Sequence, residues 1–237
     1  MRILRSVLTV ILFAVFGIGG GVISYLLLPF ASTRHAGLRI VRKSWRGMVW
    51  LFTATRLIRV DASDLGNVSG CILAANHPSL IDVVLLTALL PDTFTVARHG
   101  LKDNFLISPI VRKIFLPDDE TLLPQATSLL ASGSNILIFP EGSRTPADGV
   151  LRPFHRGTAQ LALRTGAPLR PIRIDVSRRI LGKHQSILDM GTRPIVYTFH
   201  LGDPLERDSI PDSGVFRKAA VDLTAALRER LSAASTT

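Results

Sequence analysis

The chain has 237 residues, of which 47% are hydrophobic, and this fits one α/β domain with an additional element better than two full domains. Its formal net charge of +10 favours an anionic partner, such as phospholipid headgroups, a phosphorylated cofactor or an acidic carrier protein. We expect no nucleic-acid partner, because only 6% of the residues are aromatic and no nucleic-acid-binding motif is present. The single cysteine, Cys71, excludes an intramolecular disulfide and is expected to be a buried structural residue.

Residues 6–30 are apolar and uncharged, so we expect residues 1–32 to anchor the chain in a membrane. The segment is long enough for a helix to cross a hydrocarbon core of about 30 Å. A cleaved signal peptide is the alternative, but its apolar core is usually about 7–15 residues long and a basic flank disfavours export. A glycine cluster could break the helix, so the segment either spans the membrane or forms a hairpin in one leaflet. The cluster consists of Gly17, Gly19, Gly20 and Gly21.

Basic residues dominate the flank that follows this segment. They are Arg34, Arg39, Arg42, Lys43 and Arg46. Because positively charged flanks remain on the cytoplasmic side, we expect an inner-membrane location with the rest of the chain facing the cytoplasm.

Residues 33–58 are predicted to form a basic amphipathic helix beside the membrane segment. One side is apolar and carries Val41, Trp45, Met48, Val49 and Phe52. Another side carries His35, Arg39, Arg42 and Arg46. Such a helix suits the headgroup layer of a bilayer, and the adjacent membrane segment favours that interpretation. The alternative is a surface helix that packs its apolar side on the domain.

Residues 59–237 alternate between strand-like and helix-like segments, which predicts an α/β domain with a mixed, largely parallel sheet flanked by helices. Strands are expected at 71–76, 93–98, 135–140, 169–176 and 194–202. Helices are expected at 80–90, 104–115, 124–133, 157–166 and 214–232. Residues 177–193 are predicted to form a surface excursion. Polar loops follow two of the strands, and the carboxyl ends of strands are where such sheets place their sites.

The first of these loops contains His77 and, after four intervening residues, Asp82. A carboxylate that binds one ring nitrogen of a histidine fixes the tautomer and stabilises the imidazolium, which leaves the other nitrogen to act as a base. No serine or cysteine is needed if the nucleophile is a hydroxyl of the substrate. The alternative is that Asn76 and His77 simply cap a helix. No histidine, cysteine or carboxylate cluster has metal-ligand spacing, so we predict no metal site.

The second loop reads Ile-Phe-Pro-Glu-Gly-Ser-Arg-Thr and covers residues 138–145. Gly142 permits close approach of the backbone to a ligand, and the Arg144 guanidinium matches the geometry of a phosphate. Ser143 and Thr145 add hydroxyl donors. The alternative is an ordinary turn with an arginine in solvent.

Together the two loops resemble the motifs of the glycerolipid acyltransferase family, which includes 1-acylglycerol-3-phosphate acyltransferases. The family's His-x4-Asp block is matched by His77 and Asp82. Its Phe-Pro-Glu-Gly block is matched by residues 139–142, followed by Ser143 and Arg144. A further block, a strand that enters a proline, is similar to residues 166–174 with Pro171. The resemblance covers about residues 60–200.

The resemblance implies transfer of an acyl group from acyl-CoA or an acyl carrier protein to a lysolipid hydroxyl, without an acyl-enzyme or a cofactor. His77 would deprotonate the hydroxyl and Asp82 would orient the histidine. Glu141, Gly142, Ser143 and Arg144 would position the acceptor. Lys102 is a further candidate contact for an anionic group. Membrane phospholipids are the expected surroundings.

One block departs from the family, whose second block usually supplies an arginine for the glycerol phosphate. Here Pro117, Asp118 and Asp119 stand in that place. The acceptor is therefore either 1-acylglycerol-3-phosphate or a lysolipid with another head, such as a lyso-ornithine lipid. A specialised acyl chain from a carrier protein is also open. A non-catalytic lipid-binding membrane protein is opposed by the intact motifs.

Overall fold

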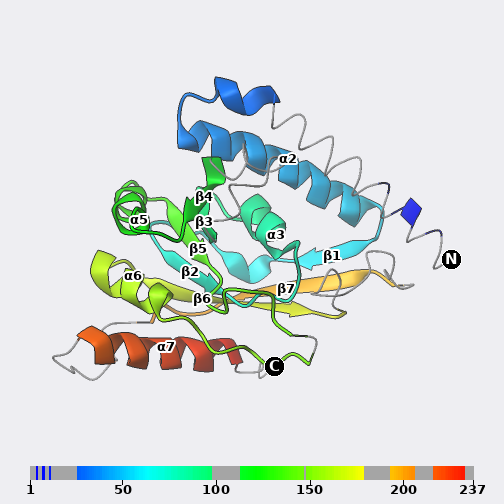
Figure 1. Ribbon diagram of the computed structural model, residues 1–237. Helices are drawn as coiled ribbons and strands as arrows, with labels where there is room; N and C mark the ends of the chain where they lie inside the picture. The colour runs from blue at the N-terminus through cyan, green and yellow to red at the C-terminus, as the bar shows by residue number, and fades with distance from the viewer. Residues whose placement is uncertain are drawn as a thin grey trace.

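The computed structural model describes residues 4, 7, 8, 11, 26–97, 113–146, 148–178, 193–205 and 216–232. Within them a seven-stranded sheet has helices on both faces, in the order β1-β7-β6-β2-β5-β3-β4 (Figure 1). The strands are β1 Ile58–Asp61, β2 Ile72–Ala75, β3 Thr93–Ala97, β4 Phe115–Pro117, β5 Asn135–Ile138, β6 Leu169–Val176 and β7 Ile195–Leu201. The helices are η1 Leu28–Phe30, α2 Arg34–Ala54, η2 Ser63–Leu65, α3 Asp82–Leu89, α5 Leu122–Ala131, α6 Gly157–Thr165 and α7 Phe216–Ser232.

The sheet is mixed and largely parallel, as predicted. Only β6 and β7 pair in antiparallel fashion among the described strands. It follows that β1 and β7 run opposite to the other strands. The carboxyl ends of β2, β5 and β6 therefore meet at one edge of the sheet, which brings the two polar loops together.

The central strand β2 is apolar on both faces because helices cover both. Leu73 and Ala75 join the core beneath α2 and α3, whereas Ile72 and Ala74 join the core beneath α6 and α7. All four are fully buried. Polar and apolar side chains therefore do not alternate along this strand. Its first polar side chain is Asn76, directly after its last residue.

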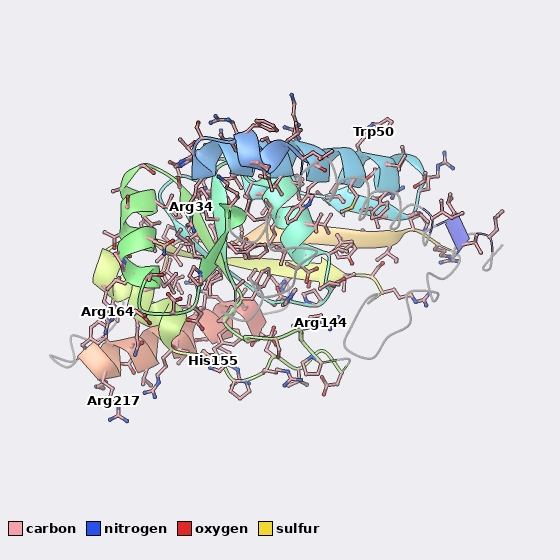
Figure 2. The ribbon with its side chains drawn as sticks, turned by 45° about the horizontal axis from the view of Figure 1, so that its top comes forward. Arg34, Trp50, Arg144, His155, Arg164 and Arg217 are labelled. Carbon is pink, nitrogen blue, oxygen red and sulfur yellow. The ribbon has the colours of Figure 1, made fainter. Side chains whose placement is uncertain are left out.

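Helix α2 packs its apolar side on the domain. Leu38, Val41, Met48 and Phe52 are buried, which is the second of the two interpretations that the sequence allows. The outer side of the helix carries exposed basic residues and Trp50, which is 69% exposed and projects outward in Figure 2. The helix thus belongs to the packed domain, and its polar side remains open to a partner.

The end of α2 differs from the prediction, which carried the helix to about residue 58. The helix ends at Ala54, and Arg56 adopts a left-handed conformation with φ of 56°. The Leu57 amide donates to the Phe52 carbonyl and closes the end of the helix. Ile58 then begins β1, a strand the sequence did not reveal because it is short and its partner is the distant β7.

Several predicted segments fall largely outside the described residues. They are the apolar segment at 6–30, the helix at 104–115 and the excursion at 177–193. Phe115, predicted to end that helix, instead begins β4. In the described part of the chain, no helix combines the length and apolarity needed to cross a bilayer.

A buried amide fixes the opposite edge of the sheet. Asn135, which is 1% exposed, accepts a hydrogen bond from the Cys71 amide at 3.2 Å. Its side-chain nitrogen donates to the carbonyls of Val68 and Pro91. One side chain therefore holds the segments that lead into β2 and β3 against the start of β5.

We predict that Asn135→Leu lowers the free energy of unfolding by about 2–4 kcal/mol, because it leaves buried backbone groups without partners. Denaturant unfolding of the full chain measures this change. The matched control is Asn67→Leu, at an exposed loop position, which should have little effect. Equal stability of the two variants would contradict the role of Asn135.

Candidate active site

The carboxyl end of β2 is locked to β6 by the side chain of Asn76. Its nitrogen donates to the Ile174 carbonyl at 2.9 Å, and its oxygen accepts from the Ile174 amide at 2.7 Å. The side chain thus continues the pairing of the two strands by one step. The backbone position of the next residue, His77, is fixed as a result.

His77 and Asp82 form a hydrogen-bonded pair, as the sequence predicts. The distance between His77 Nδ1 and Asp82 Oδ2 is 2.9 Å. The Asp82 side chain is fully buried, whereas 14% of the His77 side chain is exposed. Because Asp82 occupies Nδ1, the other ring nitrogen is the one that can exchange a proton with a substrate.

The pair is closed by the turn that leads into the helix predicted at 80–90. Helix α3 begins only at Asp82. The Ser79 amide donates to Asp82 Oδ2 at 2.7 Å, and the Asp82 amide donates to the Ser79 carbonyl. A carboxylate in the first helical turn is also stabilised by the helix dipole. These interactions hold the Asp82 carboxylate in place behind the imidazole.

Phe139 at the end of β5 supports the other side of the imidazole. The two rings stack with their centroids 4.3 Å apart and an interplanar angle of 29°. His77 is therefore held by a carboxylate at Nδ1 and an aromatic ring against its face. Such restraint fixes the direction in which Nε2 can meet a substrate.

Glu141 joins the second loop to the first. Its carboxylate accepts hydrogen bonds from the Thr145 hydroxyl at 2.5 Å and from the His77 amide at 3.3 Å. Its other oxygen accepts from the Arg152 amide at 3.1 Å. Thr145 completes the link, since its amide donates to the His77 carbonyl at 2.7 Å.

The sequence assigns Glu141 to acceptor binding, and that role stays a prediction; in the structure its carboxylate is turned into the protein. Glu141 is 3% exposed and both of its carboxylate oxygens accept from protein groups. We therefore describe Glu141 and Thr145 as a brace beneath His77. A buried carboxylate needs several hydrogen-bond donors. The backbone amides of His77 and Arg152 and the Thr145 hydroxyl supply them, so Glu141 can be buried.

The outer part of the second loop remains accessible. Gly142 has φ of 61°, a conformation that favours glycine, and its amide donates to the Phe139 carbonyl. Gly142, Ser143 and Arg144 are all partly exposed, whereas Glu141 is buried.

Two other predicted features have different outcomes. Lys102, the candidate anion contact, lies outside the described residues. Asp118 directly follows β4 and its amide donates to the Ala97 carbonyl of β3. Because β4 and β3 are parallel to β5, Asp118 lies at the same edge of the sheet as the site. In the described part of the chain, no group of histidines, cysteines and carboxylates could hold a metal ion.

Sequence reasoning missed the part played by Phe139, which stacks on the His77 ring. Phe139 is part of the recognised motif, but nothing in that pattern indicates stacking on His77.

Comparison with known proteins identifies the family. The acyltransferase family model matches residues 56–175. A 1-acyl-sn-glycerol-3-phosphate acyltransferase from Pseudomonas aeruginosa is 29% identical over 184 residues, which cover 73% of this chain and 71% of that protein. A lyso-ornithine lipid O-acyltransferase from the same organism is 32% identical over 111 residues, or 44% of this chain and 42% of that protein.

A solved structure agrees with the fold. The crystal structure of a 1-acyl-sn-glycerophosphate acyltransferase from Thermotoga maritima aligns over 100% of both chains, with a TM-score of 0.68 and 20% identity. The family model covers the β2 and β5 loops that carry the His77–Asp82 pair and the brace. The chain belongs to the acyltransferase family and is an acyltransferase.

Proposed function

We propose that the chain transfers a fatty acyl group from a thioester to the hydroxyl of a lysolipid in phospholipid biosynthesis. The hydrogen-bonded His77–Asp82 pair in an acyltransferase chain is the observation that carries this proposal. The acceptor with the best support is 1-acyl-sn-glycerol-3-phosphate, which appears in the names of relatives from Pseudomonas aeruginosa and Cocos nucifera. The donor is acyl-CoA or an acyl carrier protein, and no cofactor is required.

The proposed reaction uses His77 as the base. Nε2 takes the proton of the acceptor hydroxyl while the oxygen attacks the carbonyl carbon of the thioester. The carbon–sulfur bond then breaks, and the thiolate receives the proton from the imidazolium. Asp82 stabilises the imidazolium between these two steps. The products are the acylated lipid and a free thiol, and no acyl-enzyme forms.

The acceptor is proposed to bind at the outer part of the second loop. Gly142 permits close approach, while Ser143 and Arg144 offer donors to its phosphate. Lys102 remains a proposed further contact. Asp118 and Asp119 favour a second candidate, a lysolipid with a less anionic head, because carboxylates at this edge repel phosphate. The relative that acts on a lyso-ornithine lipid supports that candidate.

The proposed place of the reaction is the cytoplasmic face of the inner membrane. The uncharged segment at 6–30 would anchor the chain there. The exposed side of α2 carries Trp50 together with Arg39, Lys43 and Arg46, which suits anionic headgroups. The acceptor would come from the bilayer and the donor from the cytosol.

We predict that His77→Ala abolishes lysolipid-dependent release of thiol, because it removes the base. The assay offers acyl-CoA and acyl carrier protein with several lysolipids and measures free thiol. The control is His155→Ala, whose imidazole is exposed and which should retain wild-type turnover. Turnover by His77→Ala equal to that of the control would overturn the mechanism.

We predict that Glu141→Gln lowers kcat by about tenfold to a hundredfold, because the side-chain amide cannot accept from every donor of the brace and His77 shifts. The acceptor KM should change little, since the carboxylate faces the protein. Steady-state kinetics separate the two parameters. Glu120→Gln, at an exposed position, is the matched control. A rise in acceptor KM with unchanged kcat would instead support direct acceptor binding by Glu141.

A further inference from the structure

A hollow of about 450 Å³ lies on the α7 side of the sheet, at the carboxyl ends of β2 and β6. Asn76 and Pro78, the neighbours of His77, form part of its wall. His77 lies between these two residues in the chain, so the hollow adjoins the backbone that carries the base. The hollow is separate from the second loop, which lies on the β5 side of His77.

The hollow combines cationic and apolar walls. Arg173 and Arg228 supply the cations, Asp175 supplies one carboxylate, and Val150, Leu151 and Leu231 supply apolar surface. Val150 is 62% exposed, so part of this apolar surface is open to solvent. A ligand that suits both walls carries an anionic group beside an apolar chain.

The two arginines differ in how they are held. Arg173 is 13% exposed and pairs with Asp175 at 2.7 Å, so its position is fixed. Arg228 is exposed, and its guanidinium donates to the Leu151 carbonyl at 3.3 Å. Among the described residues no carboxylate lies within ion-pair distance of Arg228. Its charge is therefore available to a ligand.

Phosphate esters are the anionic groups that the proposed reaction brings to this site. The pantetheine arm of either donor carries a phosphate and an uncharged chain, and the acceptor carries a phosphate beside its acyl chain. After β4, at the same edge of the sheet, Asp118 and Asp119 stand where the family usually has an arginine for the phosphate. Arg228, with the Asp175-paired Arg173 beside it, therefore offers a second cationic position for such a group, besides Arg144.

We propose that the Arg173–Arg228 hollow binds a phosphate ester of a substrate and directs its reactive end to His77. This proposal rests on the proposed function for its ligand. Arg228→Ala and Arg228→Glu test it without disturbing the core, because the side chain is exposed. Arg217→Ala is the matched control, since Arg217 is an exposed residue at the other end of α7 (Figure 2).

We expect Arg228→Ala to raise the KM of one substrate by about tenfold and Arg228→Glu to raise it further, with kcat little changed. Acyl-CoA, acyl carrier protein and 1-acylglycerol-3-phosphate are titrated in turn. A change confined to the donors assigns the hollow to the pantetheine phosphate, and a change confined to the acceptor assigns it to the lipid phosphate. Wild-type KM values for all three would overturn the proposal.

A binding experiment separates this proposal from the proposed function. Calorimetry of coenzyme A and of 1-acylglycerol-3-phosphate with His77→Ala protein requires no turnover. Loss of binding of either ligand on adding Arg228→Glu supports the hollow even if acyl transfer is not observed. Unchanged binding of both ligands, with wild-type kinetics, contradicts the hollow while leaving the role of His77 intact.

Discussion

The buried carboxylate of Glu141 is the interaction on which the site depends. It lies where the loops after β2 and β5 meet, and it accepts hydrogen bonds from both. An ionised group in such a place costs several kcal/mol of desolvation unless donors surround it. The backbone amides of His77 and Arg152 and the Thr145 hydroxyl are those donors. The position of His77 is therefore tied to the folding of a loop sixty residues away.

The same reasoning explains why Asp82 can be fully buried. Its carboxylate meets the Ser79 amide, the first turn of α3 and the His77 ring. These interactions hold the carboxylate beside the imidazole, where it can stabilise an imidazolium. Burial also keeps water from weakening the pair. The short turn from Ser79 to Asp82 thus links the stability of α3 to the chemistry of His77.

The sequence predicts what depends on local pattern. Apolar strands that end in polar residues locate both loops, and the spacing of His77 and Asp82 matches their contact. Contacts between distant segments have no such signal. β1 is four residues long and is defined by pairing with β7. The inward direction of Glu141 follows only from the meeting of the loops after β2 and β5. An acidic residue in a polar loop looks exposed until the donors around it are known.

The central strand divides the site into two sides. Helix α3, which begins at Asp82, lies on one face of the sheet, whereas Arg173 and α7 lie on the other, where the hollow opens. Asn76 fixes the boundary, because its amide continues β2 onto β6. His77 therefore receives its orientation from one face and its proposed phosphate ligand from the other. Because the two are separate, residues that bind substrate can change without loss of the Asp82 contact that His77 requires. The acidic residues Asp118 and Asp119 after β4, beside an intact His77–Asp82 pair, are consistent with such a change.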